Sequence, residues 1–483
     1  MYNATRLEKS FIMNLVRTRI APSPTGFPHI GTIYQVIFDY VFAHKYNGQF
    51  VLRIEDTDRA RFVKEAEDVI YSSLQWFGLN PDESPVKGGE YGPYRQSERL
   101  EIYQKYVREL IEKGHAYYCF CTKERLEDMR KQQEQNKQMP KYDRHCRFLE
   151  KDDVEDKLKQ NVSHVVRMKI PDNKKIIFDD LIVGRIEFDS DGVDDQVILK
   201  SDGFPTYHLG VVVDDHLMKI SHVFRGKEWI SSTPKHVLLY EYFGWDMPLH
   251  GHLPLILNSD GKGKLSKRHG HASVDYYRTE GYLPEAVLNY LINIVWNHPD
   301  DNEIFSLEEF MQLFHVGQVN DNDDFRKLGS RGGRFDLQKL NWMNQQYIQK
   351  MDDDELLGKI IAFYPDSDLD KEIIRKLLPL LKTRMETLKD FETLTAFFFQ
   401  VPPIKIRNDK DREVVIDLIQ VLESAPTWTE QDIFLAFKTV LEKHSLRMPV
   451  LYYLLTGNEK GLPLPQVIEI LGREETLKRL KAL

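Results

Sequence analysis

The sequence predicts an α/β domain built on a parallel sheet, interrupted by an inserted α+β domain and followed by an all-α C-terminal region. Three observations lead to this fold class. A strand, a Pro/Gly turn, a helix and a second strand follow one another near the N-terminus. A middle region that contains all the cysteines mixes a polar helix with β-like segments. From Leu283 onward, apolar residues recur every three or four positions, which is typical of helices.

The N-terminal elements form one βαβ unit. "VRTRIAPS" (residues 16–23) predicts a short strand, which must stop at Pro22 because proline cannot continue a hydrogen-bonded ladder. Helical spacing of apolar residues begins at Ile30 and ends before Asn47-Gly48. "QFVLRIED" (residues 49–56) predicts the second strand. A right-handed βαβ unit of this kind indicates a Rossmann-type domain, in which ligands bind beyond the carboxyl ends of the strands.

Later elements extend this domain and divide the chain. We expect a helix over residues 93–114 with Ser97 as its N-cap, and strands in "TYHLGVVVDDH" (residues 206–216) and "HVFRG" (residues 222–226). The predicted division has a Rossmann-type domain in two halves (14–117 and 202–275), the insertion (118–201), a helical domain (276–345) and a second helical domain (346–483).

Composition restricts the class of protein. The 483 residues are 41% hydrophobic and 29% charged, with no apolar run of 18 residues, so we expect a soluble protein without a membrane span. The net charge of −9 means that a nucleic-acid partner would need local basic patches. Three cysteines and the lack of a secretory signal favour the cytoplasm, and translation could start at Met1 or Met13.

The turn before the first helix, "PSPTGFPHIG" (residues 22–31), has the chemistry of a phosphate site. Unpaired N–H groups and the positive end of the helix dipole favour an anion at a helix N-terminus. His29 could donate a hydrogen bond to a phosphoryl oxygen, and Gly31 leaves room for a base or ribose. By itself such a turn is more often a simple connection between a strand and a helix.

A second segment, "GKLSKRHG" (residues 263–270), favours the phosphate site over the simple connection. Lys264, Lys267 and Arg268 form a glycine-flanked cationic loop that suits a polyphosphate. Alone it would be an ordinary exposed turn. Together, the two segments predict one nucleotide site.

These segments resemble the two signatures of class I aminoacyl-tRNA synthetases, "PHIG" as the HIGH-type element and "KLSKR" as the KMSKS-type loop. The ordered blocks "RIAPSPTG", "LRIEDTDR", "GPYRQSER", "SDGFPTYHL", "VFRGKEWISSTPKH" and "LPEAVLNYL" are similar to those of glutamyl-tRNA synthetase of the bacterial type. The resemblance runs from about Arg17 to about Tyr347. It implies ATP-dependent ligation of L-glutamate to tRNA(Glu) through a glutamyl-adenylate, with release of AMP and diphosphate.

The resemblance also implies which residues bind the amino acid. Arg19 and Arg225 match the arginines that hold the glutamate carboxylates, and guanidinium forks suit that task. Ser23, Glu55 and Tyr207 match the positions that orient the substrate, with Glu55 opposite the α-ammonium group. Two positions near this pocket depart from the family: Lys227 replaces a usually acidic residue, and Val211 stands where some relatives have asparagine.

For ATP, the implied chemistry is in-line attack on the α-phosphate, helped by preorganised cations and by Mg²⁺ held mainly by the phosphates. The implied catalytic residues are His29, Gly31, Lys264 and Lys267. The implied ATP-binding residues are His29, Gly31, Lys264, Ser266, Lys267 and Arg268.

The cysteine region predicts a structural zinc ion. A C-x-C pair at residues 119–121 is followed by "YDRHC" at 142–146, and zinc prefers four thiolate or imidazole ligands. Relatives often carry zinc here with a final histidine, whose place Phe148 occupies. His145 is an alternative fourth ligand, and three reduced cysteines in a small apolar knot is the other interpretation. The predicted ligand set is Cys119, Cys121, Tyr142 and Cys146.

In the family, the insertion binds the acceptor stem, the domain at 276–345 contacts the tRNA stem, the helical domain at 346–483 binds the anticodon, and the enzyme is a monomer. Glutaminyl-tRNA synthetase is less consistent with the helical periodicity after Leu283, because that family ends in β-barrels. A truncated relative that modifies a tRNA base lacks the C-terminal half. A small-molecule nucleotidyltransferase and an inactive tRNA-binding paralogue are the remaining alternatives. A non-discriminating enzyme that also charges tRNA(Gln) stays open.

Overall fold

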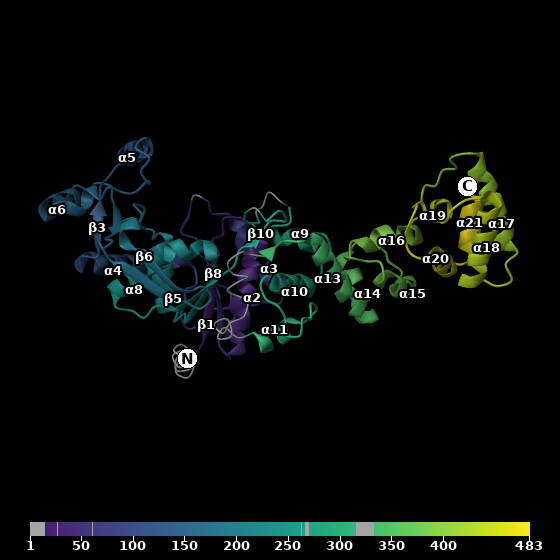
Figure 1. Ribbon diagram of the computed structural model, residues 1–483, viewed down its shortest axis with the longest axis horizontal. Coiled ribbons are helices and arrows are strands. Elements are labelled where there is room, and N and C mark those ends of the chain that lie inside the picture. Colours follow the sequence, from purple (N-terminus) through teal and green to yellow (C-terminus); the bar gives the residue numbers. More distant parts are fainter. Residues whose placement is uncertain (1–14, 27, 60, 262, 266–269, 315–332) are drawn as a thin grey trace. The chain divides into compact units, whose positions relative to one another are not determined.

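The computed structural model describes residues 15–26, 28–59, 61–261, 263–265, 270–314 and 333–483 (Figure 1). The chain divides into two compact units. The first comprises Met1–Val274 and Leu291–Phe335, and the second comprises Asp275–Tyr290 and Asp336–Leu483. None of the helices in the described residues combines the length and the apolar character that crossing a bilayer requires.

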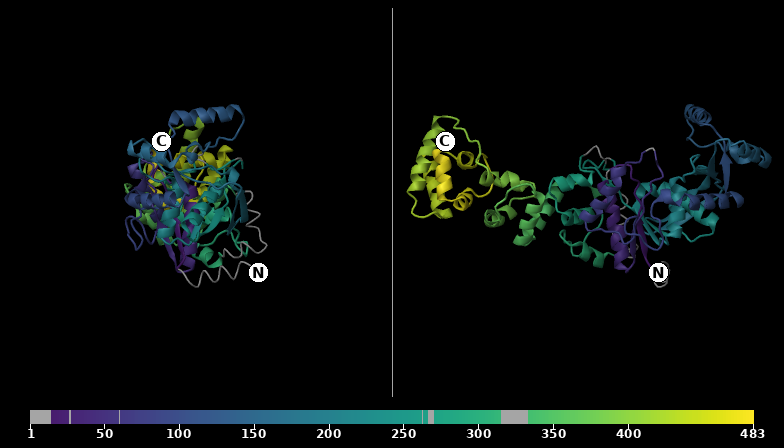
Figure 2. Two further views of the ribbon diagram at one scale, coloured as in Figure 1. Left: turned by 90° about the vertical axis from the view of Figure 1, so that its left-hand side faces the viewer. Right: turned by 180° about the vertical axis from the view of Figure 1, so that it is seen from behind.

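Parallel strands form the centre of the first unit. β1 (Arg17–Ile20) pairs with β2 (Gln49–Leu52), and α2 (Ile30–Lys45) connects them and packs beside β1 (Figures 1 and 2). β8 (His222–Gly226) pairs in parallel with β9 (Leu249–Leu253). The backbone N–H of Ser221, just before β8, donates to the Arg17 carbonyl at 2.9 Å, which brings the two pairs of strands together. The strand and helix predictions for this N-terminal stretch are confirmed.

A hairpin from the middle of the chain joins this arrangement. β5 (Lys175–Asp180) and β6 (Gly184–Asp189) are antiparallel to each other, and β5 also runs parallel to β9, giving the order β6-β5-β9-β8. Part of the predicted insertion therefore extends the sheet that carries β8. This pairing places Asp180 opposite His250 in the register.

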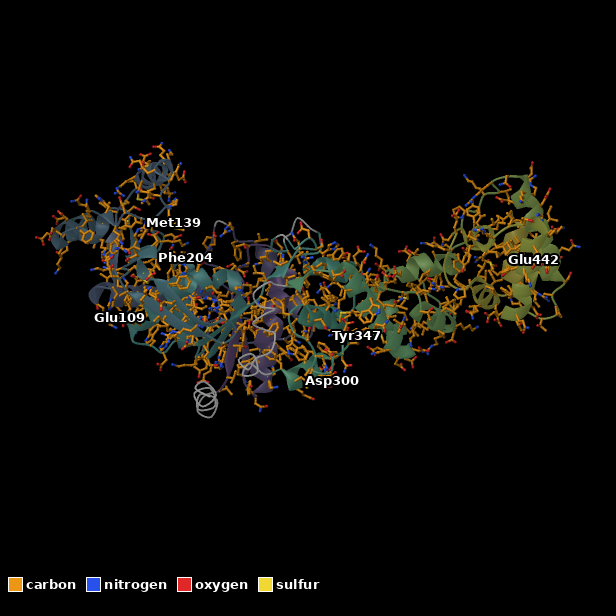
Figure 3. The ribbon with its side chains drawn as sticks, in the orientation of Figure 1. Glu109, Met139, Phe204, Asp300, Tyr347 and Glu442 are labelled. Carbon is orange, nitrogen blue, oxygen red and sulfur yellow. The ribbon has the colours of Figure 1, made fainter. Side chains whose placement is uncertain are left out.

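The rest of the middle region forms its own small sheet of β3 (Ala116–Cys119), β4 (Val165–Met168) and β7 (Val197–Leu199), in the order β3-β4-β7. The polar helices α5 (Lys123–Gln135) and α6 (Lys151–Lys159) bury none of their residues. Met139, in the loop after α5, is 87% exposed (Figure 3).

Two predictions about secondary structure are wrong. The segment "TYHLGVVVDDH" is helix α7 (Tyr207–Leu217), not a strand, and all of Leu209–Asp215 is buried. A continuous apolar run carries no periodicity that separates a buried strand from a buried helix. Ser97 is not an N-cap, because it lies inside the 3₁₀ turn η1 (Gln96–Arg99) and its N–H donates to Asp56. The α-helix itself, α4, begins later and spans Leu100–Glu112.

The first unit contains several further elements. They are α3 (Lys64–Trp76), η2 (His145–Phe148), η3 (Ser190–Gly192), η4 (Lys227–Ser232), α8 (Thr233–Phe243), α11 (Leu307–Leu313) and the parallel pair β10 (Ile256–Leu257) and β11 (Gly333–Arg334).

In its described residues the second unit is helical, as the spacing of apolar residues predicts. One apolar core includes Leu283, Leu377 and Phe391, and another includes Leu418, Phe437 and Leu454. The helices α9 and α10 lie mostly within this unit. The bounds are α9 (Val274–Thr279), α10 (Pro284–Asn293), α13 (Leu337–Lys350), α14 (Asp353–Phe363), α15 (Lys371–Lys382), α16 (Asp390–Phe399), α17 (Asp409–Glu423), α18 (Glu430–His444), α19 (Met448–Thr456), α20 (Leu464–Leu471) and α21 (Arg473–Lys481).

Candidate active site

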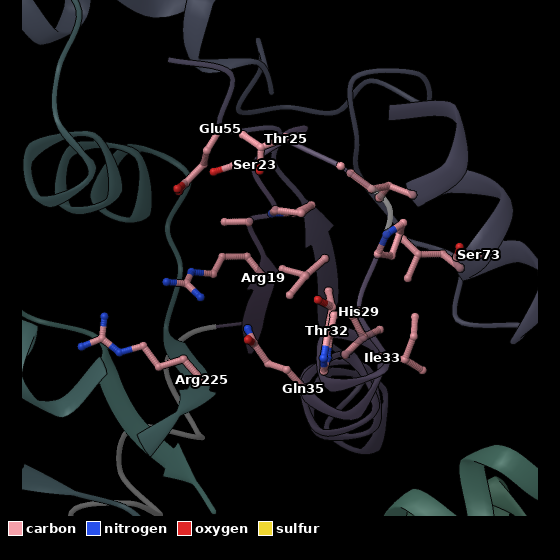
Figure 4. A pocket seen from close by; sticks show the side chains of 18 of the residues that line it. Arg19, Ser23, Thr25, His29, Thr32, Ile33, Gln35, Glu55, Ser73 and Arg225 are labelled. Carbon is pink, nitrogen blue, oxygen red and sulfur yellow. The ribbon is translucent and has the colours of Figure 1, made fainter. Parts of the chain in front are cut away.

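A cavity of about 360 Å³ lies in the first unit at the carboxyl ends of the parallel strands. β1 contributes Arg19 near its end, Glu55 follows β2, and Arg225 lies in β8. Figure 4 shows these three side chains turned toward one shared space. This is where a parallel α/β sheet places its ligand site. The cavity lining also includes Ser23 and Tyr207, which are predicted to bind glutamate, and His29, which is predicted to bind ATP.

Arg225 is a buried cation whose hydrogen-bond partners in the described residues are all uncharged. It is 3% exposed, and it donates to His252 Nε2 at 3.0 Å and to Tyr207 Oη at 3.2 Å. Two further bonds reach His236 Nδ1 at 3.3 Å and Thr233 Oγ1 at 2.7 Å. Burial lowers the pKa of Arg225, because no carboxylate in the described residues forms an ion pair with it. Such a site favours an anion from solution.

Arg19 differs, because it already has an acidic partner. Its Nε and Nη2 atoms donate to the Asp215 carboxylate at 3.2 and 3.3 Å. Burial opposes the charge of Arg19, but Asp215 raises its pKa above the ordinary value. Arg53, which is fully buried, also donates to Asp215 at 2.7 Å. Arg19 is therefore held in place by the protein itself.

The carboxyl group of Glu55 ionises near neutral pH. Burial raises the pKa of Glu55 to about 7, against the opposing effects of Arg53 and Arg19. Arg53 Nη2 donates to Glu55 Oε1 at 3.1 Å and fixes that side of the carboxyl group. An ammonium group that entered the cavity would favour the ionised form of Glu55.

Two of the remaining predicted residues occupy different parts of the cavity wall. Tyr207 is the first residue of α7, and its ring packs on Trp229 with centroids 4.7 Å apart. Its hydroxyl is fixed by the bond from Arg225, and burial raises its pKa. Ser23 lies in the exposed turn after β1, next to Glu55 in Figure 4.

The start of α2 does not have the unpaired N–H groups that the phosphate-site prediction assumes. The Ile30 N–H donates to the Ala272 carbonyl at 2.8 Å, and the Thr32 N–H donates to the His29 carbonyl at 2.7 Å. His29 is the N-cap, and its Nδ1 accepts from the backbone N–H of Gly31 at 2.9 Å. A neutral ring that accepts through Nδ1 carries its proton on Nε2, so Nε2 is a hydrogen-bond donor. A Cβ atom at position 31 would lie only 3.0 Å from His29 Nδ1. Glycine at this position therefore permits the cap.

The second signature is described only in part. Lys264 forms an ion pair with Glu228, the neighbour of the cavity residue Trp229, and it bridges to Leu257. Ser266, Lys267 and Arg268 lie outside the described residues. The convergence of this loop on the cavity therefore stays a prediction.

Sequence reasoning missed two residues that shape the cavity. Asp215 binds both Arg19 and Arg53, and Trp229 packs on Tyr207. The signal for Asp215 is present in the sequence, since "VVVDD" places an acidic pair within a buried apolar run, where each carboxylate needs a partner.

The three cysteines gather at one point of the insertion. Their sulfur atoms all lie within 4.8 Å of one another, and the Tyr142 hydroxyl lies 3.3 Å from Cys119 Sγ and 3.4 Å from Cys121 Sγ. Cys121 Sγ is 3.5 Å from Cys146 Sγ. Three thiols with a phenol at this spacing fit a tetrahedral ion. His145 is exposed and is not part of the group.

Family models match nearly the whole chain. The catalytic domain of class I tRNA synthetases (E and Q) matches residues 15–327, and an anticodon binding domain matches residues 345–483.

Individual proteins give the same result. A glutamate–tRNA ligase of Protochlamydia amoebophila is 44% identical, covering 96% of this chain and 93% of its own. A glutamate–tRNA ligase of Clostridioides difficile is 40% identical, covering 96% of this chain and 98% of its own. The crystal structure of a glutamate tRNA ligase from Elizabethkingia meningosepticum, in complex with its amino acid, matches with a TM-score of 0.83 at 35% identity over 97% of this chain and 99% of that chain. The chain therefore belongs to the glutamate–tRNA ligases, within the class I aminoacyl-tRNA synthetases.

Proposed function

We propose that the cavity is where this glutamate–tRNA ligase activates L-glutamate with ATP to form glutamyl-adenylate, before transfer of the glutamyl group to tRNA(Glu). One observation carries the assignment to this cavity: Arg225 is a buried guanidinium without a carboxylate partner among the described residues, across a shared space from the Glu55 carboxyl group. A ligand with a carboxylate and an ammonium group complements both charges.

The proposed roles follow from these charges. Arg225 and Arg19 hold glutamate carboxylates, and Glu55 receives the α-ammonium group. Tyr207 and Ser23 add hydroxyl groups that orient the amino acid. One oxygen of the substrate α-carboxylate then attacks the α-phosphorus of ATP, and diphosphate leaves on the opposite side. The protein contributes position and charge, and no side chain acts as a covalent nucleophile.

His29 and Lys264 are proposed to serve the ATP phosphates. His29 Nε2–H donates at the positive end of the α2 dipole, and Gly31 keeps that end accessible. Lys264 would exchange Glu228 for a phosphate. We extend the same role to Ser266, Lys267 and Arg268 from the resemblance. Mg²⁺ that arrives on ATP neutralises phosphate charge and needs few protein ligands.

Exchange of labelled diphosphate into ATP tests the proposal. The wild-type chain should show exchange that requires both L-glutamate and tRNA(Glu), as the family resemblance implies. His29→Ala should lower kcat by about 10²- to 10³-fold, because a preorganised donor to a developing charge is lost. Exchange that proceeds equally with His29→Ala, or never occurs with wild-type protein, would contradict the proposal and favour an inactive paralogue in the second case.

We propose tRNA(Glu) as the nucleic-acid partner, read by the helices of residues 346–483, and a monomeric enzyme. Charging of purified tRNA(Glu) and tRNA(Gln) side by side decides between a discriminating enzyme and one that also charges tRNA(Gln). Gel filtration with light scattering measures the oligomeric state.

We also propose a structural zinc ion held by Cys119, Cys121, Cys146 and Tyr142. The sulfur atoms and the Tyr142 hydroxyl are close enough to share one ion. Metal analysis should give about one zinc per chain, and Cys121→Ser should abolish it. Tyr142→Phe should weaken zinc retention during dialysis against a chelator, whereas His145→Ala should not. The reverse order for the last two variants would make His145 the ligand.

A further inference from the structure

Four bonds fix the orientation of the Arg225 guanidinium, and the one from its Nε is unusual. A guanidinium has five N–H groups, and Arg225 directs four of them to His252, Tyr207, His236 and Thr233. Arginine can only donate, so the Nε2 atom of His252, at 3.0 Å, must accept and carry no proton. The orientation of Arg225 therefore depends on which nitrogen of His252 is protonated.

Asp180 decides that protonation. Its Oδ1 atom accepts three backbone N–H bonds, from Ile182 at 2.9 Å, Val183 at 2.8 Å and His252 at 3.2 Å. Its Oδ2 atom lies 2.5 Å from His252 Nδ1. A carboxylate only accepts, so Nδ1 carries the proton and Nε2 keeps its lone pair for Arg225.

The pair is enclosed in the protein. The side chains of Asp180 and His252 are both 0% exposed. Burial lowers the pKa of His252, although Asp180 opposes this effect, so the ring is neutral with one proton to place. Asp180 ends β5 and His252 lies in β9, and the parallel pairing of these strands sets their contact.

We propose that Asp180 is a positioning residue for amino-acid binding: by holding the proton of His252 on Nδ1, it keeps Nε2 as an acceptor that orients the Arg225 guanidinium, so that its remaining Nη2–H faces the substrate carboxylate. This inference rests on the proposed function of Arg225. Asp180 acts through His252 and Arg225 and does not touch the substrate. It comes from the segment predicted as the insertion, 45 residues before Arg225 in the chain.

An isosteric change should separate this role from packing. In Asp180→Asn, the three backbone N–H groups select the amide oxygen for the Oδ1 position, which leaves the NH₂ group facing His252 Nδ1. His252 must then accept through Nδ1 and move its proton to Nε2. Two N–H groups, from His252 and Arg225, would face each other, and Arg225 would have to turn away.

The first test measures diphosphate exchange by Asp180→Asn. The KM for glutamate should rise about ten- to one-hundred-fold, as expected when a buried donor loses its acceptor, while the KM for ATP changes by less than about three-fold. Asp195→Asn is the matched control. Asp195 is also 0% exposed and also accepts a backbone N–H, from Ile170 at 3.1 Å, but it lies in another network. Its substitution should leave the KM for glutamate within about three-fold of wild type.

The second test uses a double-mutant cycle. In His252→Gln, the amide oxygen can accept from Arg225 whatever residue 180 is. Adding Asp180→Asn to this variant should change the KM for glutamate by less than about three-fold, because glutamine has no ring proton whose position residue 180 could set. An equally large increase in both backgrounds would mean that Asp180 acts by packing, and would overturn the proposal.

Nitrogen-15 NMR of the imidazole in the wild-type chain gives an answer even if Asp180→Asn fails to fold. The proposal requires a proton on Nδ1 and none on Nε2 of His252, and the opposite tautomer overturns it. The proposed function fails separately, if the wild-type protein shows no glutamate-dependent exchange. Normal wild-type exchange with an unchanged KM in folded Asp180→Asn would refute only this inference.

Discussion

Arg225 in the cavity and the exposed basic side chains of the helical unit carry the same charge in opposite surroundings. Arg225 is 3% exposed and has only neutral partners in the described residues. In the helical unit, Arg375 pairs with Asp354 at 2.6 Å, and Lys481 pairs with Glu423 at 2.6 Å. Arg225 is costly to bury and lacks an acidic partner in the described residues, whereas Arg375 and Lys481 are solvated by water and each has one.

This difference is the basis on which we propose a functional role for Arg225 and none for the surface ion pairs. An exposed ion pair contributes about 0–1 kcal/mol, so its presence or absence says little about function. A buried cation without a counter-charge destabilises the fold unless a ligand supplies the missing anion. The residues most informative about the substrate are therefore those with the least favourable environment in the ligand-free chain.

The largest expected effect comes from removing the buried cation. Arg225→Ala should lower kcat/KM for glutamate by about 10²- to 10³-fold, and Arg225→Lys should recover little, because an ammonium group cannot reproduce the planar fork. Lys481→Ala, which removes a paired surface cation, should leave this value unchanged. Steady-state exchange assays measure all three variants. A similar loss in both alanine variants would remove the distinction between the two regions.

Removing the charge of Asp215, the acidic partner of Arg19, should lower stability more than removing any surface ion pair. Asp215→Asn leaves Arg19 and Arg53 buried beside a neutral amide, so the free energy of unfolding should fall by about 3 kcal/mol. Glu423→Gln, the surface comparison, should change it by less than about 0.5 kcal/mol. Urea denaturation of both variants measures these values, and equal losses would contradict the contrast.

The ionisation of Glu55 should appear in the pH dependence of glutamate binding. Its pKa of about 7 lies above the ordinary value for glutamate, so the group is largely protonated below pH 7 and ionised above it. The KM for glutamate should therefore fall about ten-fold as pH rises from about 6 to 8 and then level off. Glu55→Gln should show a high KM that is flat over this range, and a wild-type KM that rises with pH would rule out the proposed pairing with the α-ammonium group.

The smallest effect is expected at exposed cations of the helical unit. Lys405 has no ion pair within the described residues, whereas Arg407 pairs with Glu459 at 3.3 Å. If Lys405 contacts tRNA phosphates, Lys405→Ala should raise the KM for tRNA about two- to three-fold and weaken its salt dependence. Arg407→Ala should do less, because its charge is already paired, and the opposite ranking would show that pairing in the free chain does not predict tRNA contacts.

Local sequence patterns were sufficient where one signal dominates. The proline stop after β1 and the helical spacing of α2 were both readable in one short stretch. The same reasoning failed at α7, because a helix that is buried on all sides has no apolar periodicity. It also failed at Ser97, because the Ser97 N–H donates to Asp56, which lies 41 residues away in the chain.

The sequence by itself determined the order of the elements, the family resemblance and the residue types that a glutamate and nucleotide site needs, because these depend on neighbours in the chain. Only the tertiary structure decided which cation is neutralised, which is not, and what orients it. Arg19 meets Asp215 from 196 residues away, and Arg225 meets His252, which in turn meets Asp180. Charge and hydrogen-bond partners act through distances in space, and the folded sheet sets those distances.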